Sequence, residues 1–176
     1  SPILFAIPVF MAFVGLEAWL AWRRGLKVYR LHDALTSINI GAMSETIRAL
    51  LKLLSVAVYA LVVERVGAFS WDLKSPWVWV LAFFMYDFFY YWFHRLSHEV
   101  RFWWAAHVNH HSSQEYNLST AHRQPWTGVL VGTWAPWFVL ALIGFPPHMI
   151  FLQSGFNLLY QDWLHTQAIR RMPGWF

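Results

Sequence analysis

Residues 76–111 of this 176-residue chain read PWVWVLAFFMYDFFYYWFHRLSHEVRFWWAAHVNHH. An apolar run covers 76–93, and five of the chain's nine histidines follow directly after it. They form two groups, one of His94 and His98, the other of His107, His110 and His111. Residues three or four apart lie on one side of a helix, so each group would present its imidazoles on a common face. This stretch predicts a metal site at the end of a membrane-embedded helix.

The composition is typical of an integral membrane protein. Hydrophobic residues make up 58% of the chain, aromatic residues 20% and charged residues 12%. Each value differs from the average of soluble proteins in the direction expected of a protein embedded in lipid. Thirteen Trp and seven Tyr residues suit the headgroup level of a bilayer. The chain has no cysteine, so any metal must be held by nitrogen and oxygen. The net charge of +4 is too modest to suggest a nucleic-acid partner.

Hydrophobic segments recur along the chain and approach the roughly 20 apolar residues that cross a ~30 Å hydrocarbon core. They cover residues 3–22, 47–63, 76–93, 127–145 and 147–160. The first contains one charge, Glu17, and lacks the basic leader and cleavage site of a signal peptide. We therefore predict an all-α, multi-pass bundle of about four to five transmembrane helices, forming a single membrane domain over residues 1–176.

Basic residues orient this bundle in the membrane. Four of them follow the first segment: Arg23, Arg24, Lys27 and Arg30. The positive-inside rule places that loop in the cytoplasm. Alternation of the segments then brings both histidine groups, His165 and the Arg170-Arg171 pair to the cytoplasmic side. We expect the active site to face the cytoplasm.

The two histidine groups leave several metal chemistries open. Neutral imidazole binds Fe, Zn, Cu or Ni, and the adjacent His110-His111 pair favours more than one ion. A zincin-type protease is excluded because Arg95 stands where that motif requires Glu. A haem held by two histidines remains an alternative, and with it a membrane electron carrier, although it uses only two of the ligands.

Polar residues inside the segments are candidates for contacts to the metal ligands. Asn157, Gln161 and His165 recur every four residues, which predicts a polar stripe that ends beside the histidine groups. We interpret His165 as a ligand or as a neighbour of the ligands. Asp87 lies two helical turns before His94 on the same face, where its carboxylate would accept the second N–H of a metal-bound imidazole.

The remaining acidic residues and histidines carry weaker signals. Glu99 and Glu115 lie near the two groups and are candidate oxygen ligands, although charges at helix ends are usually only solvated. His32 and His148 have no metal-ligand spacing, and we expect them to be structural. The role of His122, which follows the second group, stays open.

Several motifs combine into a family pattern. They are Tyr90-Tyr91-Trp92-Phe93-His94-Arg95 with His98-Glu99, Trp104-Ala105-Ala106-His107 with His110-His111-Ser112-Ser113, Tyr116-Asn117-Leu118-Ser119-Thr120-Ala121, and Phe156-Asn157-Leu158-Leu159-Tyr160-Gln161 with Trp163, His165 and Thr166. Together, over about residues 80–170, they resemble the fatty acid hydroxylase and sterol desaturase superfamily. Within it, they resemble the alkylglycerol monooxygenases and their bacterial relatives.

The resemblance implies a membrane enzyme with a histidine-rich, non-haem di-iron site that uses O2 to hydroxylate or desaturate the alkyl chains of lipids. The carbon next to an ether oxygen is one candidate position. Sterol desaturation and aldehyde decarbonylation are alternatives. The implied iron ligands are His94, His98, His107, His110 and His111, with His165 as a further family histidine. Tetrahydropterin is the implied reductant, but no pterin-binding signature is visible, and an electron-donor protein such as a cytochrome or ferredoxin stays open.

The chain departs from the family pattern in one respect. A third histidine cluster is expected soon after His165, and the sequence ends at Phe176 without it. Two irons use on the order of ten to twelve ligand positions, and the strong candidates here number six. We therefore expect a truncated piece of a longer enzyme, which by itself binds metal weakly or not at all; a non-catalytic fragment is an alternative.

Overall fold

The computed structural model describes residues 2–167, 169 and 174, the first five of these by their backbone alone. Every regular element among the described residues is a helix, which confirms the all-α prediction. The elements in chain order are α1 (Pro2–Arg23), α2 (Leu31–Val66), α3 (Pro76–Glu99), α4 (Arg101–His107), the 3₁₀ turn η1 (His110–Ser112), α5 (Leu118–Ala121), the 3₁₀ helix η2 (Trp126–Val131), α6 (Ala135–Ile143), α7 (Pro147–Asp162) and the 3₁₀ turn η3 (Trp163–His165).

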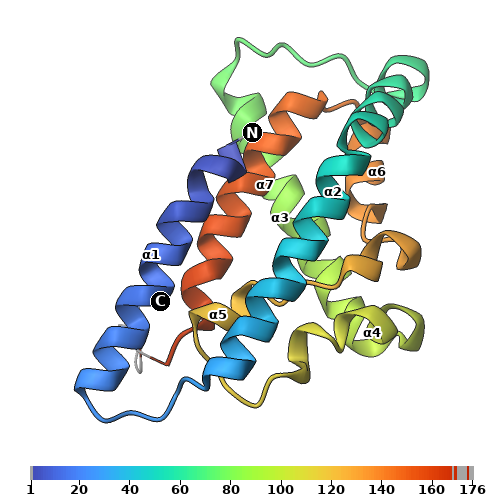
Figure 1. Cartoon of the computed structure of the whole chain (residues 1–176). Helices are drawn as coiled ribbons and strands as arrows, with labels where there is room; N and C mark the ends of the chain where they lie inside the picture. The colour runs from blue at the N-terminus through green and yellow to red at the C-terminus, as the bar shows by residue number, and fades with distance from the viewer. Residues whose placement is uncertain (1, 168, 170–173, 175–176) are drawn as a thin grey trace.

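The long helices α1, α2, α3 and α7 give the molecule two ends (Figure 1). One end holds the α2–α3 loop and the α6–α7 turn, which are joined by backbone hydrogen bonds from Ala68 N–H to the Leu142 carbonyl (2.8 Å) and from Phe69 N–H to the Ile143 carbonyl (3.2 Å). The other end holds the α1–α2 connection together with α4, η1, α5 and η3. We call this second end the histidine end.

The apolar core packs α3 against α6 and α7. Its buried side chains are Val78, Ala82, Tyr86, Leu140, Phe145, Met149 and Ile150. Trp71 stacks on Phe145 with their ring centroids 5.0 Å apart. Because burial of these side chains fixes α3 beside α7, the last turns of both helices meet at the histidine end.

Helix α2 has both a membrane-like surface and a close-packed polar face. It is the one helix in the described part of the chain that is long and apolar enough to cross a membrane. It begins well before the predicted 47–63 segment because no proline interrupts residues 31–46. On its other face Ser37, Gly41 and Ser44 are buried, and a Cβ on Gly41 would lie 2.2 Å from the His122 carbonyl oxygen. These small residues let α2 approach residues 120–125 closely.

The predicted fourth span, residues 127–145, is wrong as one continuous helix. It consists of η2 and α6, which are separated at Gly132, a residue in the left-handed region with φ +83°. The nine residues of α6 cover only about 14 Å, too little for a ~30 Å core. The other four segments fall within α1, α2, α3 and α7. The count of four to five transmembrane helices is therefore not established by the fold.

Candidate metal centre

All six histidines predicted as ligands lie at the histidine end. His94 and His98 occupy the last turns of α3, His107 ends α4, His110 and His111 lie on η1, and His165 ends η3. The expectation that one helix carries the second group is wrong, because α4 ends at His107 and a turn at residues 108–109 separates it from η1. After that change of direction His107 and His111 still contact the histidines of α3, whereas His110 faces His165.

Four imidazoles converge on one point. The Nε2 atoms lie 3.2 Å apart between His94 and His98, 3.3 Å between His98 and His107, and 3.2 Å between His107 and His111. One ligand nitrogen from each of the four lies within 4.8 Å of all the others. His94 and His107 are partly buried, whereas His98 and His111 are exposed. The group is therefore open to solvent on one side.

Hydrogen bonds alone do not account for these contacts. An imidazole Nε2 carries either one N–H or one lone pair in the ring plane, so it takes part in one hydrogen bond. His98 and His107 each have two such contacts, so at most two of the three can be hydrogen bonds. Two nitrogens that bind one ion at about 2.1 Å, in neighbouring coordination positions, lie roughly 3.0–3.4 Å apart. The donor set therefore fits a metal ion that receives all four lone pairs.

His110 and His165 form a second pair with fixed tautomers. The Nδ1 of His110 lies 3.1 Å from the Arg123 carbonyl, and that of His165 lies 2.8 Å from the Gln161 carbonyl. A carbonyl oxygen only accepts, so each ring donates through Nδ1–H and, when neutral, keeps a lone pair on Nε2. The two Nε2 atoms face each other at 3.1 Å. Two lone pairs at this distance need a cation between them, and a carbonyl-held Nδ1–H is usual for metal-bound histidine.

Burial keeps several of these imidazoles neutral. Desolvation, followed by the charges of neighbouring histidines, lowers the pKa of His94 to about 4 and that of His107 to about 3. Desolvation and then His165 lower the pKa of His110 to about 4. Desolvation also lowers the pKa of His111. Neutral imidazole is the form that binds metal, so these rings are ready to bind an ion at neutral pH.

A chain of polar side chains runs between α3 and α7 toward His94. The Asp87 carboxylate accepts a hydrogen bond from Asn157 (3.3 Å), whose own carbonyl oxygen accepts from Gln161. The Tyr90 hydroxyl donates to the Gln161 side-chain oxygen (2.7 Å) and lies 3.5 Å from Nδ1 of His94. Asp87 therefore contacts Asn157 and not an imidazole, which corrects the direct contact expected from the sequence.

The other sequence candidates make their contacts outside the six imidazoles. Glu99 pairs with Arg95 at 3.0 Å on the surface of α3, and Glu115 pairs with Arg30 at 2.7 Å. His32 is exposed at the start of α2. His148 lies beside Trp79 near the opposite end, with a ring separation of 6.3 Å. His122 packs against Phe10 at 5.7 Å.

Sequence reasoning missed three residues that support the site: Tyr90, Arg123 and Glu17. Glu17 is buried, and its carboxylate accepts hydrogen bonds from Tyr29 (2.6 Å), the Leu118 N–H (2.8 Å) and the Thr166 hydroxyl. It thereby ties α1 to the residue that follows His165. The sequence contained one indication of this role: Glu17 is the one charged residue in the first apolar segment.

Comparison with known proteins adds independent information. A protein-family model described as Fatty acid hydroxylase matches residues 79–176. The chain is 40% identical over 168 residues to alkylglycerol monooxygenase from Homo sapiens, covering 95% of this chain and 37% of the relative. Identity to the protein of that name from Xenopus tropicalis is 38% over 165 residues, covering 93% and 36%. The chain thus spans little more than a third of the length of these curated relatives. No solved structure was found to match it.

Proposed function

Because this chain belongs to the fatty acid hydroxylase family, we propose that it forms the di-iron core of a membrane-bound, O2-dependent lipid monooxygenase. The proposal rests on the contacts among the six imidazoles. Their Nε2 atoms lie close together, but the rings do not carry enough N–H groups for every contact to be a hydrogen bond. His94, His98, His107 and His111 would hold one ion, and His110 with His165 would hold the other. Bound iron would supply the O2 chemistry that an unactivated C–H bond requires and that no side chain provides.

Side chains around the imidazoles keep them in ligand geometry. The Arg123 and Gln161 carbonyls fix the tautomers of His110 and His165. The network from Asp87 to Tyr90 holds the α3 and α7 ends together beside His94. Such contacts position ligands before the metal arrives and so lower the cost of binding it.

The alkyl chain of a lipid is the substrate class that the surface near the site supports. An open hollow on α3, lined by Phe84, Met85, Asp87, Phe88 and Tyr91, offers apolar area about two turns from His94. A second, small cavity adjoins His107 and is lined mainly by apolar groups, including Phe93, Trp103 and Ala106. The relatives are alkylglycerol monooxygenases, and this supports the proposal of attack next to an ether oxygen.

The proposed orientation puts the site at the cytoplasmic face of a multi-pass protein. The basic α1–α2 connection lies at the histidine end (Figure 1), where Arg30 contacts Glu115 at 2.7 Å. Both features therefore lie on one side of any membrane that the helices cross. Arg170 and Arg171, which were part of the same prediction, lie outside the described residues. The reductant, a tetrahydropterin or an electron-donor protein, remains a proposal drawn from the family resemblance.

Iron analysis with an optical spectrum tests the proposal. The chain is purified in detergent from iron-supplied cells, beside His107→Ala and the control His148→Ala, which lies away from the site. We expect iron without a Soret band in the wild type and in the control, and a loss of iron in His107→Ala. A haem carrier, which would use two of the histidines as ligands, is the alternative that the sequence left open. A Soret band, or iron unchanged in His107→Ala, would overturn the di-iron assignment.

A further inference from the structure

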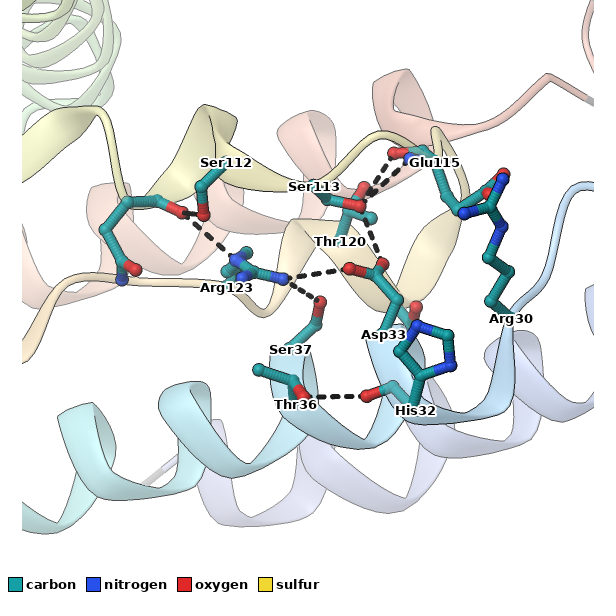
Figure 2. A network of polar contacts seen from close by, with 12 residues as sticks. Arg30, His32, Asp33, Thr36, Ser37, Ser112, Ser113, Glu115, Thr120 and Arg123 are labelled. Carbon is teal, nitrogen blue, oxygen red and sulfur yellow. Dashed lines mark hydrogen bonds and ion pairs between the residues drawn. The ribbon is translucent and has the colours of Figure 1, made fainter.

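Arg123 joins three separate segments at the histidine end (Figure 2). Its guanidinium donates to the Asp33 carboxylate (3.2 Å) and to the Ser37 hydroxyl (3.2 Å), both on α2. It also donates through Nε to the backbone carbonyl of Asn109 (3.1 Å). The ion pair with Asp33 is largely buried, with side-chain exposures of 11% and 18%. A planar guanidinium is suited to such a fork of contacts, whereas an ammonium is not.

Asp33 holds the same loop from the other side. Its second carboxylate oxygen accepts a hydrogen bond from the Ser113 hydroxyl at 2.6 Å (Figure 2). The Ser113 oxygen in turn accepts from the Glu115 N–H at 3.0 Å. The segment 109–113 is therefore fixed at Asn109 through Arg123 and at Ser113 directly. His110 and His111 lie between these two points.

The same arginine provides the carbonyl that orients His110. That carbonyl accepts the Nδ1–H of His110 at 3.1 Å. The ion pair with Asp33 therefore holds both partners of one hydrogen bond. It fixes Arg123, whose carbonyl accepts the bond, and it fixes the loop that carries the donor, His110. A shift on either side would turn the His110 ring and change which nitrogen is protonated.

We propose that Asp33 and Arg123 are positioning residues for His110, which hold its Nε2 lone pair toward His165. The inference rests on the proposed metal function and deepens it. Asp33 lies on α2, outside the residues 79–176 that match the family model. The N-terminal helices thus supply part of the metal centre rather than only a membrane anchor.

Two variants separate positioning from folding. Asp33→Asn keeps the side-chain shape but removes the charge, and Arg123→Lys keeps the charge but cannot maintain all three contacts. The matched control is Glu45→Gln, which removes the acidic partner from an exposed ion pair with Arg48 on the same helix. Near-ultraviolet circular dichroism establishes that each purified chain is folded. Removing one partner of a buried ion pair is strongly destabilising in general, so Arg123→Lys is the variant to measure if Asp33→Asn does not fold.

The first readout needs no metal. In nitrogen-15 histidine spectra of the metal-free chain in detergent, with His110 assigned through His110→Gln, wild-type His110 should carry its proton on Nδ1. We expect the two variants to show both tautomers of His110 in exchange, and Glu45→Gln to match the wild type. Identical His110 tautomers in the wild type and in a folded variant would overturn the proposal.

The second readout is a Co²⁺ titration of the same proteins. Losing a group that orients a ligand costs about 10- to 100-fold in metal affinity, so the variants should bind the His110–His165 ion at least about tenfold more weakly. Binding at the four-histidine group should match the control. Unchanged affinity at both sites in a folded variant would contradict the proposal. A wild type that binds no Co²⁺ would instead overturn the proposed function, while the tautomer measurement would still decide the role of Asp33.

Discussion

His110 and His165 face each other through Nε2 at 3.1 Å, although they lie 55 residues apart and each donates its Nδ1–H to a backbone carbonyl. The pair joins η1 to η3, two short turns from different parts of the chain. Burial and the neighbouring histidine lower the pKa of His110 to about 4. At neutral pH a proton shared between the two Nε2 atoms is therefore a poorer bridge than a metal ion. This contact is the main support for the proposed second ion beside the four-histidine group.

Replacing His165 should remove one of two classes of metal site. In His165→Ala, His110 loses its facing ligand while the four imidazoles around His107 are unchanged. We expect a Co²⁺ titration to lose its weaker phase and retain its tighter one, because four ligands bind more strongly than two. His148→Ala should keep both phases. Loss of the tighter phase in His165→Ala would show that the two groups are not separate.

His94 and His107 should stay neutral at mildly acidic pH in the metal-free chain. Desolvation and neighbouring imidazoles lower their pKa values to about 4 and about 3. The unfolded chain therefore binds more protons than the folded one between pH ~6.5 and pH ~4, and these two histidines make the fold less stable as the pH falls through that window. Nitrogen-15 titration of both rings checks the pKa values, and a midpoint near 6.5 for either would contradict the burial.

Gly41→Ala should disturb the packing of α2 on the site. The new Cβ would lie 2.2 Å from the His122 carbonyl oxygen, next to Arg123, and such overpacking costs about 1–3 kcal/mol. We expect a lower midpoint of thermal unfolding, followed by tryptophan fluorescence. Gly15→Ala is the control, since nothing lies within 4 Å of its Cβ, and alanine favours a helix by about 1 kcal/mol. Equal midpoints for the two variants would contradict the close approach.

Glu17→Gln should weaken the connection between α1 and the histidine end. The carboxylate accepts hydrogen bonds from Tyr29, Leu118 and Thr166, whereas an amide nitrogen cannot accept, so one buried donor loses its partner at a cost of about 1–3 kcal/mol. We expect a loss of stability and weaker binding at the His110–His165 pair, because Thr166 follows His165. The exposed Glu64→Gln is the control. A stability equal to that of this control would show that Glu17 does not support the histidine end.

The sequence predicted the long helices because lipid-like composition and periodicity are local properties. The apolar runs at 76–93 and 147–160 became the cores of α3 and α7. The break at Gly132 was missed because residues 127–145 contain no charged side chain, and hydropathy does not register a positive φ. The extension of α2 to residue 31 was missed because polar residues interrupt the apolar pattern over residues 31–46, and two of them, Ser37 and Ser44, are buried against the protein.

The sequence also predicted which histidines gather, because His94, His98, His107 and His111 share regular spacing and a motif. It did not predict the partition into four and two, which depends on the turn after His107 and on the packing of α7 beside α3. The supporting contacts of Asp33 and Glu17 join residues about 90 and 101 positions apart. Spacing along one helix carries no information about such long-range pairs.

The Mössbauer spectrum of the chain, loaded anaerobically in detergent with isotopically enriched ferrous iron, tests whether the six histidines form a non-haem iron centre. We expect non-haem ferrous iron in nitrogen-rich coordination, in up to two environments, with the signal of the four-histidine site lost in His107→Ala. A folded wild-type chain that binds no iron, or a spectrum unchanged by His107→Ala, would contradict it.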